Sequence, residues 1–137
     1  MFQINQIVKR GAEWEYERKS NMKYPRHGHA CCSVGENFIV VTGSRKDVQR
    51  APFRTELFSI NDNKWFELGM FNNGRHYHSS CSFDNSAIYI FCGISNETKK
   101  YLNSIEKLVF NPSNIAQSMS NKWELLTVSD QVLLAPR

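Results

Sequence analysis

The chain has 137 residues, of which 41% are hydrophobic and 22% charged, and its formal net charge is +4 at pH 7. This length suits one domain of ordinary size, and no segment resembles a signal peptide or the roughly twenty apolar residues of a membrane span. We therefore expect a cytoplasmic protein with no membrane partner. The four cysteines, two of them adjacent at Cys31 and Cys32, lack the spacing of a disulfide framework and are expected to stay reduced.

The first residues are read as an N-terminal extension at 1–11, followed by a tryptophan run. Residues 12–24 contain Trp14-Glu15-Tyr16-Glu17 and resemble the last strand of a unit that recurs further along the chain. We expect this strand to belong to a preceding or ring-closing unit.

Two similar segments dominate the rest of the chain. Residues 26–43 read RHGHACCSVGENFIVVTG, and residues 75–93 read RHYHSSCSFDNSAIYIFCG. The Arg, both His, one Cys and the next Ser recur 49 positions later, whereas the closing Gly recurs 50 later, which we assign to an extra residue in the turn at 84–86. A period near 50 residues with β-type patterning predicts units that bury their faces against neighbouring units.

Each copy continues with two further apolar runs, at 55–60 and 64–68 in the first copy and at 104–110 and 122–126 in the second. An insertion at 111–121 separates the second pair and is expected to be a loop. Short β-branched and aromatic runs between Gly, Asn, Asp and Ser predict four strands per unit and no sustained helix.

The order Pro-Arg-x-x-His, a turn, an apolar strand ending in Gly, then Glu and then Trp resembles the kelch repeat over residues 12–137. Kelch units usually close the second strand with a Gly-Gly pair, and here Ser44 and Ile94 follow the closing glycines. The resemblance implies an all-β fold, a partial kelch-type β-propeller with two complete four-stranded antiparallel blades plus flanking strands. These are blade 1 at 25–68, blade 2 at 69–126 and the start of a further blade at 127–137. Because propellers contain roughly four to eight blades, a longer chain, self-association or another chain would have to complete the ring.

Several recurring residues are expected to form the framework of the units. Arg26 and Arg75 should bond to neighbouring backbone or to Glu56 and Glu106. The three tryptophans should cover the gaps between units, and three cysteines should act as small buried hydrophobic residues. These two sets are Trp14, Trp65 and Trp123, and Cys32, Cys81 and Cys92.

Basic residues gather in the loops that join the second strand of a unit to the third, and the last strand to the next unit. The kelch resemblance implies partner binding by these loops, and loops on a rigid scaffold often carry function. The alternative is that the charges only keep the loops solvated. The expected partner-binding residues are Arg45, Lys46, Arg50, Arg54, Lys99 and Lys100.

Two histidine pairs offer a second interpretation. Residues two apart on a strand point to the same side, so His27 with His29 and His76 with His78 are candidates for a zinc or copper site. Alternatively, His29 and His78 are hydrogen-bonding framework residues.

No catalytic motif or phosphate-cradling loop is present, so we expect neither an enzyme nor a cofactor. The aromatic residues fall on strands expected to be buried, which disfavours nucleic-acid binding. The sequence therefore predicts a non-enzymatic protein-interaction or scaffold module for an acidic protein partner. A structural subunit of a large assembly and a metal-dependent enzyme using the His pairs are the alternatives.

Overall fold

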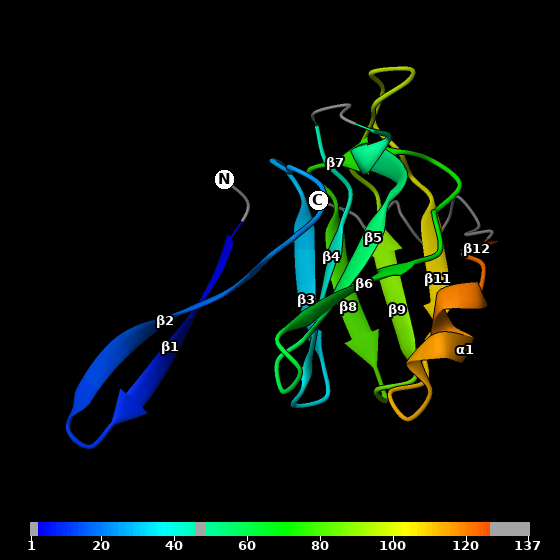
Figure 1. Ribbon diagram of the computed structural model, residues 1–137. Helices are drawn as coiled ribbons and strands as arrows, with labels where there is room; N and C mark the ends of the chain where they lie inside the picture. The colour runs from blue at the N-terminus through cyan, green and yellow to red at the C-terminus, as the bar shows by residue number, and fades with distance from the viewer. Residues whose placement is uncertain (1–2, 46–48, 127–137) are drawn as a thin grey trace, which may run out of the picture.

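A computed structural model describes residues 3–45 and 49–126 of the chain (Figure 1). The expected start of a further blade at 127–137, and Lys46, lie outside these residues. The described part is all-β, as predicted, with one short α-helix and one short 3-10 helix (Ala51–Phe53). It contains no helix that is long and apolar enough to cross a membrane.

Two four-stranded antiparallel sheets form the body of the molecule, and in each sheet the strands follow one another in chain order. Strands that follow one another along a chain usually lie side by side in a sheet. The first sheet consists of β3 (Ala30–Val34), β4 (Phe38–Thr42), β5 (Thr55–Ser59) and β6 (Lys64–Leu68). The second consists of β8 (Ser79–Phe83), β9 (Ala87–Phe91), β11 (Ile105–Val109) and β12 (Glu124–Leu126).

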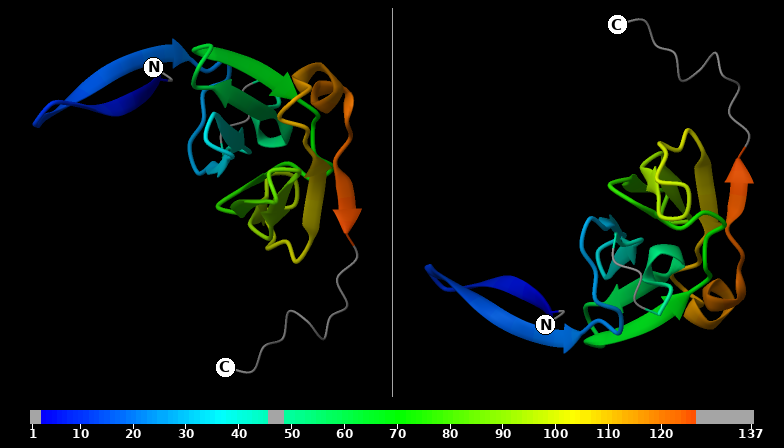
Figure 2. Two further views of the ribbon diagram at one scale, coloured as in Figure 1. Left: turned by 90° about the horizontal axis from the view of Figure 1, so that it is seen from below. Right: turned by 90° about the horizontal axis from the view of Figure 1, so that it is seen from above.

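The two sheets pack through an apolar core. Strand β3 lies beside β8, and the outer strands β6 and β12 follow one another along the opposite side of the body (Figure 2). Val40 and Leu57 of the first sheet and Ile90 and Leu108 of the second are fully buried in one cluster. Neither sheet buries this face without the other.

The register of the two sheets corrects the expected position of the extra residue. Val34 pairs with Phe38 and Phe83 pairs with Ala87, so both turns contain three residues. The residue that follows β4 is Gly43, whereas the residue that follows β9 is Cys92. Both have a positive φ, of 69° and 56°.

Cys92, and not Gly93, is therefore the counterpart of Gly43. The Gly43 N–H donates to Arg54 O and the Cys92 N–H donates to Ser104 O, immediately before β5 and β11. Residues 92 and 93 thus correspond to 43 and 44, and the added residue lies in the loop after them. The expectation that Ile94 matches Ser44 was wrong for the same reason.

A protruding hairpin precedes the body. Strands β1 (Gln3–Arg10) and β2 (Glu13–Asn21) pair as a two-stranded sheet that extends away from the two larger sheets (Figure 1). Residues 1–11 were expected to be only an extension, yet most of them form a strand.

The hairpin joins the first sheet through the end of β2. The Trp65 indole N–H donates to Ser20 O at 2.8 Å, just as that of Trp123 donates to Gly69 O at 2.8 Å. Because Gly69 follows Trp65 by four positions and Ser20 follows Tyr16 by four, Tyr16 is the counterpart of Trp65.

The prediction that Trp14 is buried was therefore wrong. Its side chain is 66% exposed, whereas Trp123 is 5% exposed. The described residues place no sheet beyond the hairpin that could cover it.

The insertion between β11 and β12 also differs from the expected loop. It contains α1 (Ile115–Ser120), which lies near β6. The Asn114 side chain caps the helix by accepting from the N–H of Gln117 at 3.0 Å. The buried Ser118 hydroxyl accepts from the N–H of Asn111 at 2.7 Å and so closes the insertion on itself.

Candidate functional site

The loops that follow β4 and β9 leave the same end of the two sheets, which we call the loop end (Figure 1). Between the loops lies a pocket of about 410 Å³ that is lined by Arg45, Phe53, Asn96, Glu97 and Lys99. A buried polar network anchors the base of each loop.

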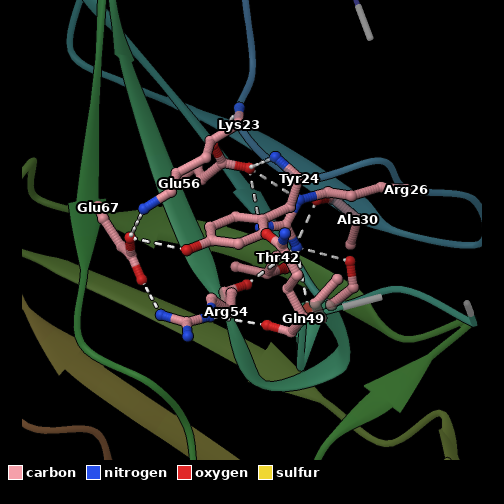
Figure 3. A network of polar contacts seen from close by, with 11 residues as sticks. Lys23, Tyr24, Arg26, Ala30, Thr42, Gln49, Arg54, Glu56 and Glu67 are labelled. Atoms are coloured by element: carbon pink, nitrogen blue, oxygen red, sulfur yellow. Dashed lines mark hydrogen bonds and ion pairs between the residues drawn. The ribbon is translucent and has the colours of Figure 1, made fainter. Parts of the chain in front are cut away.

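A buried ion pair fixes the base of the first loop. The Arg26 guanidinium donates to one carboxylate oxygen of Glu56 at 3.0 and 3.2 Å, and neither side chain is more than 2% exposed (Figure 3). Its third nitrogen donates to the carbonyls of Gly43, Ala51 and Arg54, at 2.8, 3.2 and 2.9 Å. One side chain thus holds the first, middle and last parts of the loop.

The second loop has the same anchor. Arg75 donates to Glu106 at 2.8 Å and to the carbonyls of Cys92 and Ser104 at 2.9 and 3.2 Å. Glu106 in turn accepts from the N–H groups of Asn72 and Asn73, which precede Arg75 in the chain. The predicted pairing of both arginines with Glu56 and Glu106 is confirmed.

Burial alone would disfavour these charges. It lowers the pKa of Arg26 and Arg75, and the neighbouring Glu56 and Glu106 oppose that shift. Such pairs contribute little net stability compared with apolar packing, but removal of one partner leaves an unpaired buried charge that costs about 3–5 kcal/mol. We infer that their role is to specify the loop conformation.

A second, more exposed network of polar contacts includes Arg54, one of the predicted binding residues. Arg54 forms an ion pair with Glu67 and lies over the Tyr24 ring, 4.9 Å from its centroid (Figure 3). Burial raises the pKa of Glu67, but hydrogen bonds from Lys23, Tyr24 and Arg54 outweigh it and leave that pKa lowered. Arg54 is therefore engaged within the fold by a carboxylate and an aromatic ring, and it is only partly exposed.

Four of the predicted binding residues are exposed at the loop end: Arg45, Arg50, Lys99 and Lys100. Arg50 lies over the Phe53 ring, with its guanidinium carbon 5.1 Å from the centroid, and the Lys99 ammonium donates to Asn96 O. Lys46 lies outside the described residues. The structure thus brings Arg45 and Lys99, which are far apart in the sequence, to one pocket.

Asn96 joins the two loops, and sequence reasoning did not single it out for this role. Its side-chain NH₂ donates to Arg45 O at 3.0 Å, its side-chain oxygen lies 2.8 Å from His76 Nδ1, and its N–H donates to Gly74 O. The only signal in the sequence was the sequon that begins at Asn96, which indicates a surface loop and not a link between loops.

The four histidines do not converge on a metal site. His76 and His78 are buried, while His27 and His29 are exposed. The rings of the buried pair bond to different partners, Asn96 and Thr42. In the part of the chain that the structure describes, no three His, Cys, Asp or Glu side chains are placed to hold a metal ion.

His78 has a structural role as a hydrogen-bonding residue between the sheets. His78 Nε2 lies 2.8 Å from the Thr42 hydroxyl of the neighbouring sheet. Burial, with a smaller contribution from Arg75 and other nearby cations, lowers its pKa from 6.5 to about 3. A neutral ring that links two sheets matches the framework interpretation of His78.

The cysteines differ in burial, although three of them were expected to be buried alike. All four thiols are free, Cys32 and Cys92 are half-buried, and Cys81 is exposed on the open face of the second sheet. Its counterpart Cys32 is covered because the second sheet packs on the first. The prediction of a buried residue was therefore wrong for Cys81.

The chain was also compared with known proteins. No model of a known protein family matches it, and no curated protein has a similar sequence.

Proposed function

We propose that the chain is a segment of a kelch-type β-propeller that has no catalytic role and acts in the cytoplasm as a protein-interaction or scaffold module. Its loop end would bind an acidic protein partner. The observation that carries this proposal is the set of exposed cations on two anchored loops, two of which, Arg45 and Lys99, line one pocket. The four cations are Arg45, Arg50, Lys99 and Lys100.

The arrangement of the sheets supports the propeller. Blades of a propeller are four-stranded antiparallel sheets placed radially. Strands β3 and β8 lie together, as innermost strands would, and β6 and β12 lie along the outer side (Figure 2). The recurrence of the Arg–Glu anchor in both sheets also fits repeated units.

The charge of the loop end supports an acidic partner. Among the described residues that line the pocket, Glu97 is the one acidic residue, against Arg45 and Lys99. A locally positive surface accelerates encounter with acidic partners and disfavours basic ones. Because the Arg26–Glu56 and Arg75–Glu106 pairs hold the loop bases, little conformational entropy should be lost on binding.

Charge reversal at the loop end tests the proposal. The variant Arg45→Glu, Arg50→Glu, Lys99→Glu, Lys100→Glu should bind a fluorescent polyglutamate peptide at least about tenfold more weakly than the unchanged chain, and its affinity should no longer fall with salt. Fluorescence anisotropy at several salt concentrations measures both effects.

The control reverses two exposed lysines, Lys64 and Lys122, which lie at the opposite end of the sheets. This variant should retain the affinity and the salt dependence. Equal binding by the loop-end variant and the unchanged chain would refute the basic loop end as the binding surface.

A further inference from the structure

Two apolar surfaces lie open at opposite ends of the array that the described residues form. The first, the hairpin face, is formed by the cross-strand pairs Ile7 with Tyr16 and Lys9 with Trp14. Ile7, Trp14 and Tyr16 are 57%, 66% and 80% exposed, and they line a hollow of about 610 Å³.

The second surface lies on the side of the second sheet that faces away from the first, and we call it the outer face. It contains a groove of about 360 Å³ with a nearly apolar lining. Tyr89 and Phe91 stack there with centroids 6.3 Å apart, and Phe83 is 63% exposed. The lining residues are Cys81, Phe83, Tyr89, Phe91, Ile105 and Leu126.

These two surfaces are the repeat counterparts of the two faces that already pack together inside the molecule. In the strand register, Phe83 and Tyr89 of the outer face match Val34 and Val40, which the second sheet buries completely. On the hairpin face, Tyr16 matches Trp123, which is buried against Phe71 with centroids 5.6 Å apart. The part of the chain from 3 to 126 that the structure describes therefore carries one face of each kind that no other described residue covers.

We propose that a second copy of this chain fills them, with the hairpin face of one copy docked on the outer face of the other. The interface would continue the sheet-on-sheet packing between β3–β6 and β8–β12. Because it joins two different surfaces, it is heterologous, and such contacts either close into a ring or extend as a chain of copies.

Differences between the outer face and its counterpart favour a hairpin as the occupant over a complete sheet. A Cβ at Gly43 would lie 2.4 Å from Arg75 O, in the segment that leads to the innermost strand of the neighbouring sheet. The outer face has Cys92 at this position. A complete sheet docked in the same way would meet that side chain, whereas the hairpin has no innermost strand.

A second substitution leads to the same conclusion. Thr42, which bonds to His78 just before the neighbouring innermost strand β8, is replaced on the outer face by Phe91. A histidine at the equivalent position of an incoming sheet would lose its hydrogen-bond partner there. The hairpin contributes no such histidine.

The outer face is also more polar than the internal one. Lys107 opposite Glu124 takes the place of Leu57 opposite Phe66, and the Lys107 ammonium lies 5.8 Å from the Tyr89 ring centroid. A face with a central charged pair suits a contact that forms and dissociates, because each copy must also be stable alone.

Mixing two variants tests the proposal. Tyr16→Lys damages only the hairpin face and Phe83→Lys only the outer face, and both positions are already exposed, so the fold should survive. Sedimentation velocity should give the unchanged chain at least twice the monomer mass at tens of micromolar and each variant the monomer mass. An equimolar mixture of the two should form a dimer and nothing larger, since one intact hairpin face and one intact outer face remain.

The control is Met119→Lys, which adds the same charge to an exposed position on α1, away from both faces, and should leave assembly unchanged. A monomeric unchanged chain would overturn the proposal. So would a mixture that stays monomeric, or the loss of assembly in only one of the two variants, which would indicate pairing of like faces. The loop end takes no part in these contacts, so the result is independent of peptide binding there.

Discussion

His78 shows how one residue can link two sheets and make stability depend on pH. Its side chain is buried, bonds to Thr42 across the sheet interface and is neutral near pH 7 because its pKa is about 3. The unfolded chain takes up a proton there near pH 6.5, whereas the folded chain does so only near pH 3. Stability from this residue is therefore complete above about pH 6.5 and is lost as the pH falls toward 3.

His78→Gln should reduce the slope of stability against pH. In the unchanged chain this histidine contributes up to about 1.4 kcal/mol per pH unit between pH 6 and 4. The glutamine variant can still bond to Thr42 but does not titrate, so its unfolding free energy should fall less over that range. Urea unfolding at pH 6, 5 and 4 measures the difference. The control is His27→Gln, which makes the same substitution at an exposed histidine. Parallel slopes for His78→Gln and the unchanged chain would contradict the assignment.

At the scale of elements, the end of β4 shows why a glycine is required there. Gly43 has a φ of 69°, and a Cβ would lie 2.4 Å from Arg75 O and 2.5 Å from His78 Cε1. Gly35 has a similar φ of 60°, but the nearest atom to its Cβ would be 3.8 Å away, on Asn85. The two positions share the backbone strain and differ in the space available.

Gly43→Ala should therefore destabilise the protein much more than Gly35→Ala. The left-handed conformation costs about 1–2 kcal/mol for alanine at either site, and overpacking against the second sheet adds about 1–3 kcal/mol at Gly43 alone. Chemical denaturation compares the two free energies of unfolding. Equal losses at both sites would mean that the second sheet moves aside without cost.

The sequence predicted the strands and their order better than it predicted their exposure. Runs such as Phe38–Val41, between turn residues, identify β4, and the repeated Arg and Glu positions identified both ion pairs before the contacts were known. The sequence did not show that Cys92 is the counterpart of Gly43. Aligning the two closing glycines gives a different register from the one that the backbone hydrogen bonds establish. Nor could the sequence show that Trp14 is exposed, since burial depends on which sheet lies beside a strand.

The loop end illustrates the same limit. Five of the six predicted binding residues lie in the described part, yet Arg54 is engaged by Glu67 and Tyr24. The role of Asn96 depends on an approach of two loops that no local pattern records. Long-range contacts of this kind are a property of the tertiary structure, whereas charge and turn chemistry can be read locally.

For the whole molecule, the shared core implies that the two sheets unfold together. Leu108 of the second sheet is fully buried in the same cluster as Val40 and Leu57 of the first. In repeat arrays, stability is approximately the sum of the units' own terms and the terms of the interfaces between them. When a unit cannot bury its face alone, the interface term makes unfolding cooperative.

Leu108→Ala should therefore lower protection in both sheets. A buried Leu→Ala change costs about 2–5 kcal/mol, and if the sheets open as one unit, amides in β4 and β5 lose as much protection free energy as those in β9 and β11. Amides of the β1–β2 hairpin, which contacts the body mainly through Ser20, should exchange fastest in both proteins. Leu125→Ala, in the same sheet but 51% exposed, should change little. Hydrogen exchange read by mass spectrometry resolves these segments, and a loss confined to β9 and β11 would show that the first sheet is stable without the second.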